Sequence, residues 1–243
     1  MTKNKISVNK YIIVTGVTVI LFAIQFLFSR LGWLVASLFD YSAIDQDSLF
    51  AEVTVHHIVQ LLCSFSVIGV LYKIKNIDRF KLRPKYDSKG LKYTVIFCSV
   101  LLVYYTVVYI AGTFFHSINT FDYDLNARNM IGTLGFQLFL SGPSEEVLFR
   151  SLPITVLLYC MQPANRKDRV IAVVIAAFLF GLGHINIMTF YIPWFQVCYA
   201  FVLGLVYGFV LIKTNSIIYP MIMHSLSNVI SVGGCYLYML FMK

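Results

Sequence analysis

Three ionisable side chains lie close together inside a long apolar run of this sequence. They are Glu145, Glu146 and Arg150, in the stretch S-G-P-S-E-E-V-L-F-R that begins at Ser141. One charge at the depth of a lipid bilayer costs roughly 2.5–3.5 kcal/mol on insertion scales, so such a group is retained where it faces a partner or water. The stretch is therefore a candidate functional site.

Helical geometry gives the two glutamates different roles. Proline has no backbone N–H and suits the first turn of a helix, so Gly142-Pro143 is expected to end one helix and begin another, with Ser144 as its N-cap. Residues four apart share a helix face, which predicts that Glu146 pairs with Arg150. Glu145 lies about 140° from Arg150 around the same helix. One acid is then structural, and Glu145 is left for chemistry.

Few other polar groups lie deep in the apolar runs. His184 follows F-L-F-G-L-G, and His224 and Asn228 share a helix face in H-S-L-S-N. Each also has a structural interpretation: a histidine near a helix end is often interfacial, and two polar groups on one face can be hydrogen-bond partners between helices. No chemistry is assigned to three histidines at the ends of apolar runs, His56, His57 and His116.

Together these groups meet the requirements of hydrolysis. A carboxylate can activate water, a histidine can position that water or carry its proton, and a His/Asn pair can donate hydrogen bonds to a developing oxyanion. The serines of S-G-P-S are not part of a G-x-S-x-G or Ser/Lys arrangement, so a serine nucleophile is not indicated.

Composition places this chemistry in a membrane. The 243 residues are 59% hydrophobic and 12% charged, whereas soluble domains are about 25% charged. We expect an all-α, polytopic transmembrane bundle, with residues 1–243 as a single integral membrane domain. The net charge of +8 lies in short loops, where topology explains it without nucleic acid. The five cysteines form no C-x-x-C pair, so neither a disulfide framework nor a zinc knuckle is indicated.

Hydropathy predicts seven spans of about 20 residues each. They cover approximately 11–29, 55–72, 91–115, 130–160, 169–187, 191–212 and 216–241. The fourth is long and contains Gly142-Pro143, so an eighth span stays open. The N-terminus and loops 73–92 and 161–169 are rich in Lys and Arg, whereas loops 30–54 and 116–129 are acidic. This alternation predicts a multi-pass plasma-membrane protein with a cytoplasmic N-terminus.

Three blocks of the sequence resemble one family of membrane proteins. E-E-V-L-F-R, F-G-L-G-H and H-S-L-S-N, at residues 145–150, 180–184 and 224–228, are similar to the E-E-x-x-x-R, F-x-x-x-H and H-x-x-x-N motifs of the CAAX-protease and bacteriocin-processing family of intramembrane proteases. That family is related to the type II CAAX prenyl endopeptidases. The blocks occur in order within a core of about 130–230, whereas the spans in 1–129 resemble no family.

The resemblance implies hydrolysis of a peptide bond without a required metal or other cofactor. It implies that Glu145 activates water with the help of His184, that His224 and Asn228 hold the oxyanion, and that Glu146 and Arg150 support them. The substrate would be a membrane-associated or lipidated peptide or protein, for example in bacteriocin processing or immunity. Two aromatic side chains near the site are expected to wall it from lipid, Phe149 and Phe180.

Two alternatives from other classes stay open. A zinc peptidase would use His184, His224 and a glutamate as ligands, although the sequence has no H-E-x-x-H. A non-catalytic immunity, regulatory or transport protein would use the same polar groups as a binding site near the bilayer midplane.

Overall fold

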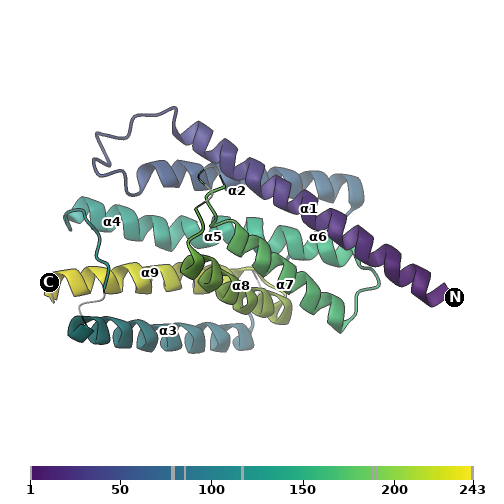
Figure 1. The fold of residues 1–243 in the computed structure, drawn as a ribbon. Coiled ribbons are helices and arrows are strands. Elements are labelled where there is room, and N and C mark those ends of the chain that lie inside the picture. Colours follow the sequence, from purple (N-terminus) through teal and green to yellow (C-terminus); the bar gives the residue numbers. More distant parts are fainter. Residues whose placement is uncertain are drawn as a thin grey trace.

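The structure is a computed structural model that describes residues 2–77, 80–84, 86–115, 118–187, 189 and 191–241, with side chains from residue 10 onward. Within these residues the chain is helical and forms no strand, apart from an isolated bridge between Asn186 and Tyr191. The predicted all-α class is confirmed (Figure 1). The helices are α1 (Thr2–Ala36), α2 (Ala51–Lys75), α3 (Ser88–Phe115), α4 (Ala127–Phe136), α5 (Gly142–Glu146), α6 (Leu152–Cys160), α7 (Arg166–Leu182), α8 (Trp194–Thr214) and α9 (Ile218–Phe241).

Four helices in the described part of the chain are long and apolar enough to cross a membrane. They are Lys10–Ala36 of α1, and the whole of α2, α3 and α8. The shortest, α8, has 21 residues and is about 32 Å long at 1.5 Å per residue, which matches a hydrocarbon core of about 30 Å. α3 exposes most of its apolar side chains, as a lipid-facing helix does. These features support an integral membrane protein, and the number of crossings stays a prediction.

The segment 127–160 is one continuous helical rod, so the break predicted at Gly142-Pro143 is wrong. Two π-helical segments, η1 (Gln137–Ser141) and η2 (Val147–Ser151), connect α4, α5 and α6. Each ends two residues before a proline, Pro143 or Pro153. A proline ring crowds the carbonyl four residues earlier, and the wider π turn, which bonds i to i+5, relieves that crowding. The rod therefore passes both prolines without ending.

Ser144 is not the N-cap that the sequence suggested. Because the rod is continuous, no free helix N-terminus exists at this position, and the Ser144 hydroxyl instead donates to the carbonyl of Leu140 at 2.8 Å. α7 also ends earlier than the predicted span 169–187, at Leu182.

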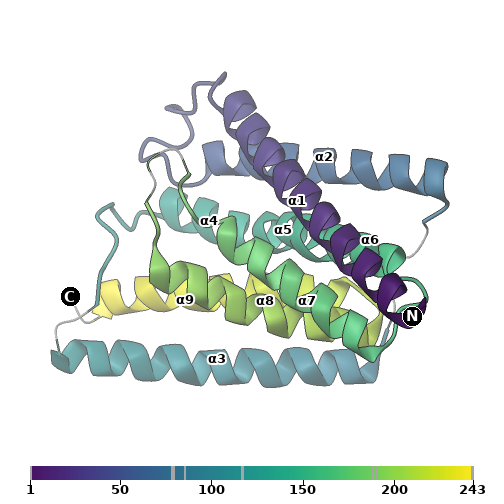
Figure 2. The same ribbon diagram turned by 45° about the vertical axis from the view of Figure 1, so that its right-hand side comes forward.

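The middle of the rod lies at the centre of the bundle. α5 contacts α2 on one side and α9 on the other, while η2 contacts α7 (Figure 2). The contact with α9 requires a glycine, since a Cβ at Gly142 would lie 2.7 Å from the Met221 carbonyl oxygen and 2.9 Å from the Ser225 backbone nitrogen. The E-E-V-L-F-R stretch is thereby surrounded by the helices that carry the other polar groups.

Candidate active site

Glu146 and Arg150 form the closed half of the site. Both side chains are fully buried, and the Arg150 guanidinium lies 3.0 Å from the Glu146 carboxylate in the predicted i,i+4 pairing. The guanidinium also lies over the Phe180 ring, 3.8 Å from its centroid. The ion pair and the cation–π contact compensate for removing this charge from water.

His224 connects the two glutamates. Its Nδ1 lies 2.8 Å from Oε1 of Glu146, and its Nε2 lies 3.4 Å from Oε2 of Glu145. The ring stacks on Tyr207 with centroids 5.2 Å apart, and the residue is 5% exposed. An ionised carboxylate only accepts hydrogen bonds, so Nδ1 of His224 donates to Glu146 and carries a hydrogen. The buried pair of Glu146 and Arg150 therefore sets the orientation of the His224 imidazole.

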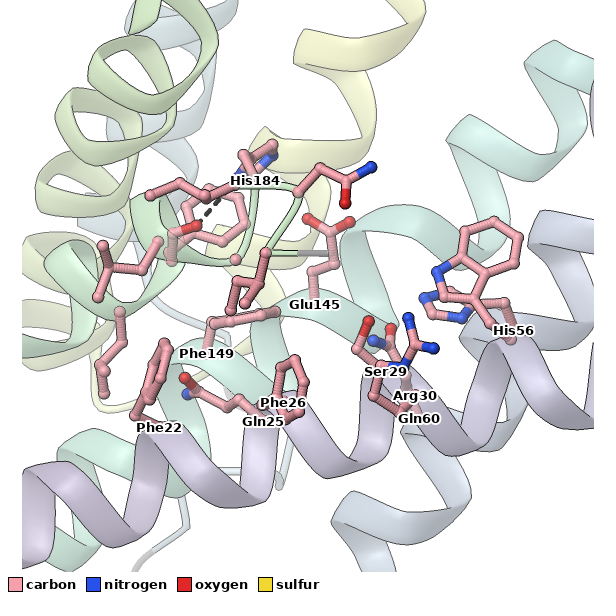
Figure 3. A pocket seen from close by; sticks show the side chains of 18 of the residues that line it. Phe22, Gln25, Phe26, Ser29, Arg30, His56, Gln60, Glu145, Phe149 and His184 are labelled. Carbon is pink, nitrogen blue, oxygen red and sulfur yellow. Dashed lines mark hydrogen bonds between the residues drawn. The ribbon is translucent and has the colours of Figure 1, made fainter. Parts of the chain in front are cut away.

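Glu145 differs from its neighbour because it reaches a cavity. Its side chain is 18% exposed, against 0% for Glu146, and it lines a cavity of about 490 Å³. Figure 3 shows Glu145 and His184 facing this space opposite polar side chains of α1. The lining comes from α1, α2, the E-E-V-L-F-R stretch, the end of α7 and the loop after it, and α8. The structure pairs Glu146 with Arg150 and leaves Glu145 at the cavity, and the use of Glu145 for chemistry stays a prediction.

His184 lies in the turn immediately after α7 and lines the same cavity. Its Nδ1 is 2.9 Å from the carbonyl oxygen of Phe180. A carbonyl only accepts, so Nδ1 carries the hydrogen and Nε2 of the neutral ring keeps a lone pair for chemistry. Phe149 and Phe180 also line the cavity and pack edge to face with centroids 5.2 Å apart.

Asn228 lies one turn after His224 on α9 but points toward the rod. Its Nδ2 donates to Oε1 of Gln137 and to Oγ of Ser141, each at 2.9 Å. Neither Asn228 nor His224 is among the described residues that line the cavity. Of the residues predicted for the site, the structure thus places Glu145, His184, Phe149 and Phe180 at the cavity, with His224 behind Glu145 and Asn228 farther along α9.

One residue in contact with the site was missed. His57, on α2, has Nδ1 2.7 Å from Oγ of Ser144 and Nε2 3.8 Å from Oε1 of Glu145. The sequence assigned it no chemistry because nothing local indicates which helix α2 contacts. Its neighbour His56 stacks on Trp33 at 4.2 Å and lines the cavity, and His116 lies outside the described residues.

The polar wall of the cavity was also missed, although a signal for it exists. Gln25 and Ser29 of α1 line the cavity together with Trp33, and all three lie on one helix face at a spacing of four residues. Polar residues at this spacing inside an apolar span indicate a face turned toward protein or water instead of lipid.

One comparison with known proteins matches the part of the chain that carries the site. Residues 127–230 match the family model described as "Type II CAAX prenyl endopeptidase Rce1-like". This segment begins at α4 and ends in α9, so it contains all three motif blocks, whereas α1, α2 and α3 lie outside it. A search of curated proteins and a search of solved structures gave no match. The segment that carries the site is therefore similar to the type II CAAX prenyl endopeptidase Rce1-like family, a protease family.

Proposed function

We propose that the chain is a glutamate-dependent intramembrane endopeptidase that hydrolyses a peptide bond of a membrane-associated or lipidated peptide or protein. The observation that carries the proposal is the position of Glu145. Its carboxylate opens into a cavity inside an apolar bundle, and it is adjacent to a glutamate that is held closed by Arg150. A carboxylate inside an apolar bundle that faces a cavity and two imidazoles, with no Lys or Arg paired to it as Arg150 is to Glu146, indicates a functional role.

In the proposed reaction, Glu145 takes a proton from a water molecule in the cavity while the water oxygen attacks the carbonyl carbon of the substrate. Nε2 of His184 accepts a hydrogen bond from the same water and orients it. The proton on Glu145 then passes to the leaving nitrogen, the C–N bond breaks, and a new carboxyl group and a new amine result. General-base catalysis of this kind contributes typically about 10²–10⁴-fold in rate.

Hydrogen-bond donors must stabilise the oxyanion of the tetrahedral intermediate. We assign this to His224 and Asn228. His224 presents Nε2 at 3.4 Å from Glu145 and donates from that atom when it is protonated. Asn228 gives both N–H groups to Gln137 and Ser141 in this structure, so its role requires that one of these bonds is exchanged for the oxyanion when the substrate binds.

The cavity supports a peptide as the substrate. Its volume of about 490 Å³ falls within the range of about 300–1,000 Å³ that is typical of ligand sites. Phe149 and Phe180 give it an apolar edge beside Glu145, which suits an apolar side chain next to the cleaved bond, and Gln25, Ser29 and Gln60 give the opposite wall hydrogen-bonding groups for a peptide backbone.

A comparison of cells tests the proposal and identifies the substrate. Membrane peptides from cells with the wild-type chain are compared with those from cells with Glu145→Gln, which keeps the shape of the side chain and removes its basicity. Uncleaved precursors should accumulate with the variant when both proteins are present in equal amounts. An identical set of peptides would refute the peptidase and favour a binding or transport protein.

The zinc alternative has a separate test. Zinc would polarise the substrate carbonyl and lower the pKa of its bound water, a role that the proposal gives to donors and to Glu145. Purified wild-type protein treated for a long time with a strong chelator should keep its activity. Inactivation by the chelator that added zinc reverses would establish the metal mechanism instead.

A further inference from the structure

We infer that His57 is a positioning residue for Glu145, supplied by α2 from outside the segment that matches the family. The inference rests on the proposed function, because it concerns how the base of that reaction is held. His57 is 7% exposed, and its ring contacts two consecutive residues of α5, Ser144 through Nδ1 and Glu145 through Nε2. The ring also packs edge to face on Phe136, with centroids 4.9 Å apart.

The hydrogen bonds of Ser144 determine which nitrogen of His57 carries the hydrogen. A hydroxyl has one hydrogen to donate, and the acceptors near Ser144 Oγ are the carbonyl oxygens of Leu140 at 2.8 Å and Ser141 at 3.1 Å. Oγ therefore accepts from His57, so Nδ1 of His57 is protonated. The neutral ring then keeps its lone pair on Nε2, the atom that faces Glu145.

This tautomer suits a base that gains a proton during the reaction. At 3.8 Å Nε2 is too far from Oε1 for a hydrogen bond, so His57 does not compete with water for the ionised carboxylate. Once Glu145 has taken a proton, a shift of its carboxyl group by about 1 Å toward His57 brings the O–H within hydrogen-bond distance of the lone pair on Nε2. His57 thus stabilises the protonated form of Glu145 that exists only after the attack.

The two carboxylate oxygens of Glu145 have an imidazole each. His57 lies at Oε1 and His224 at Oε2, one from α2 and one from α9. The carboxyl group is thereby held between two rings, so rotation about its last bonds is restricted and it keeps facing the cavity. Misplacement of a catalytic group by 1 Å can cost about 10²-fold in rate, so this restraint is expected to act on turnover.

Three substitutions at position 57 separate this role from packing. His57→Gln places an amide near the position of Nε2, His57→Asn places one near Nδ1 and keeps the bond to Ser144, and His57→Phe keeps the size of the ring only. The measurement is kcat and KM of the purified protein on a quenched fluorescent peptide that spans a cleavage site found in the cellular comparison, together with thermal melts.

The three variants are expected to differ in kcat. His57→Asn and His57→Phe should lower kcat on the order of 10²-fold with KM nearly unchanged, whereas His57→Gln should retain most of the turnover. Ser64→Ala is the matched control, because Ser64 is a buried residue of α2 whose hydroxyl donates to the Gln60 carbonyl of the same helix. It should leave kcat at the wild-type value.

The inference would be overturned if His57→Asn and His57→Phe kept the wild-type kcat. Equal losses of kcat in His57→Asn and His57→Gln would also overturn it. If the substitutions at 57 prevent folding, Ser144→Ala decides, since it leaves the His57 ring in place and removes the acceptor that sets its tautomer, together with a hydrogen bond inside the rod: it should lower kcat, and an unchanged kcat would overturn the inference. Loss of activity in Glu145→Gln with normal His57 variants refutes this inference alone, whereas an active Glu145→Gln refutes the proposed function.

Discussion

The buried pair of Glu146 and Arg150 makes a strong prediction for single residues. Arg150→Ala leaves the Glu146 carboxylate at 0% exposure with no cation, and breaking a buried pair in this way typically costs about 3–5 kcal/mol. Thermal melts in detergent should show a large loss of stability. Arg169→Ala, at an exposed position of α7, is the control, and equal melting temperatures for Arg150→Ala and the wild type would contradict the pairing.

Asn228 is predicted to affect the turnover rate of the enzyme. Removal of one oxyanion donor typically costs about 10²–10³-fold in kcat, so Asn228→Ala should lower turnover by that order with little change in KM. Asn228→Asp should be worse, because a carboxylate near the developing oxyanion repels it. Both effects would be measured by steady-state kinetics, and near-normal turnover of Asn228→Ala would remove Asn228 from the oxyanion site.

The sequence predicts residue contacts well when both partners lie on one helix. Glu146 and Arg150 are four residues apart, and helical geometry alone gives their pairing. His57 and Ser144 are 87 residues apart, so their contact depends on how α2 packs on the rod. No pattern within α2 contains that information, so the sequence alone assigns His57 no chemistry.

At the scale of elements, Gly142 sets the distance between the rod and α9. Alanine in place of glycine inside a helix normally stabilises by about 0.5–1 kcal/mol, but a Cβ at 142 would meet backbone atoms of Met221 and Ser225. Gly142→Ala should instead lower both the melting temperature and the turnover, because α9 must shift with His224. Gly135→Ala, with nothing within 4 Å, should be neutral or stabilising, and equal behaviour of the two variants would contradict this account.

Asp168 connects α7 to α1 and makes the stability of the fold depend on pH. Its carboxylate lies 2.8 Å from Nζ of Lys10 and caps α7 by accepting from the Asn165 backbone. Burial raises its pKa, but the hydrogen bonds from Lys10 and Asn165 and the Lys10 charge together bring the pKa below the ordinary value of 3.8. A lowered folded-state pKa means that the ionised side chain stabilises the fold above about pH 4, and that this stability is lost as the pH falls through the folded-state pKa.

The corresponding measurement compares melting temperatures of the wild type and Asp168→Asn between pH 7 and pH 3. The wild type should melt higher at pH 7, and the gap should narrow in the acid range. A gap that stays constant with pH would show that the Asp168 charge does not contribute.

The π-helical segments show why one element was predicted wrongly. Gly142-Pro143 is a strong local signal for a helix boundary. The helix continues because a wider turn precedes the proline, and that turn depends on how the rod packs against α2, α7 and α9. π-helical turns are frequent at functional sites. Here they lie on either side of α5, the short helix that ends with the two glutamates.

At the scale of the whole molecule, the described charges are distributed unevenly between the two ends of the bundle. The N-terminus, the end of α2, and the starts of α3 and α7 lie together at one end (Figure 2), which carries Lys10, Lys73, Lys75, Lys89, Lys92, Arg166, Lys167 and Arg169. The opposite end carries Asp40, Asp45, Asp47, Glu52, Asp122 and Asp124. The arrangement agrees with the alternation read from the loops, for which the basic side is cytoplasmic.

Cysteine labelling tests this orientation. A cysteine introduced at Ser88, at the basic end, should be protected from a membrane-impermeant thiol reagent in intact cells and react after the cells are opened. A cysteine at Ser42, in the loop between α1 and α2, should react in intact cells. The reverse pattern would place the N-terminus outside.

The whole molecule also shows what the N-terminal helices contribute. α1 and α2 lie outside the family segment, yet they supply Gln25, Arg30, His56, His57 and Gln60 to the cavity. Hydropathy predicted these helices as spans but not as part of the site, because the apolar pattern describes their contact with lipid and contains no information on their partners.

The kinetics of Glu145→Gln test the central claim most directly. The purified variant and the wild type are compared on the same quenched peptide, and a thermal melt of each shows that the fold is intact. Loss of the general base should lower kcat by about 10²–10⁴-fold at an unchanged melting temperature. Turnover within a few-fold of the wild type in the folded variant would contradict the assignment of Glu145 as the base.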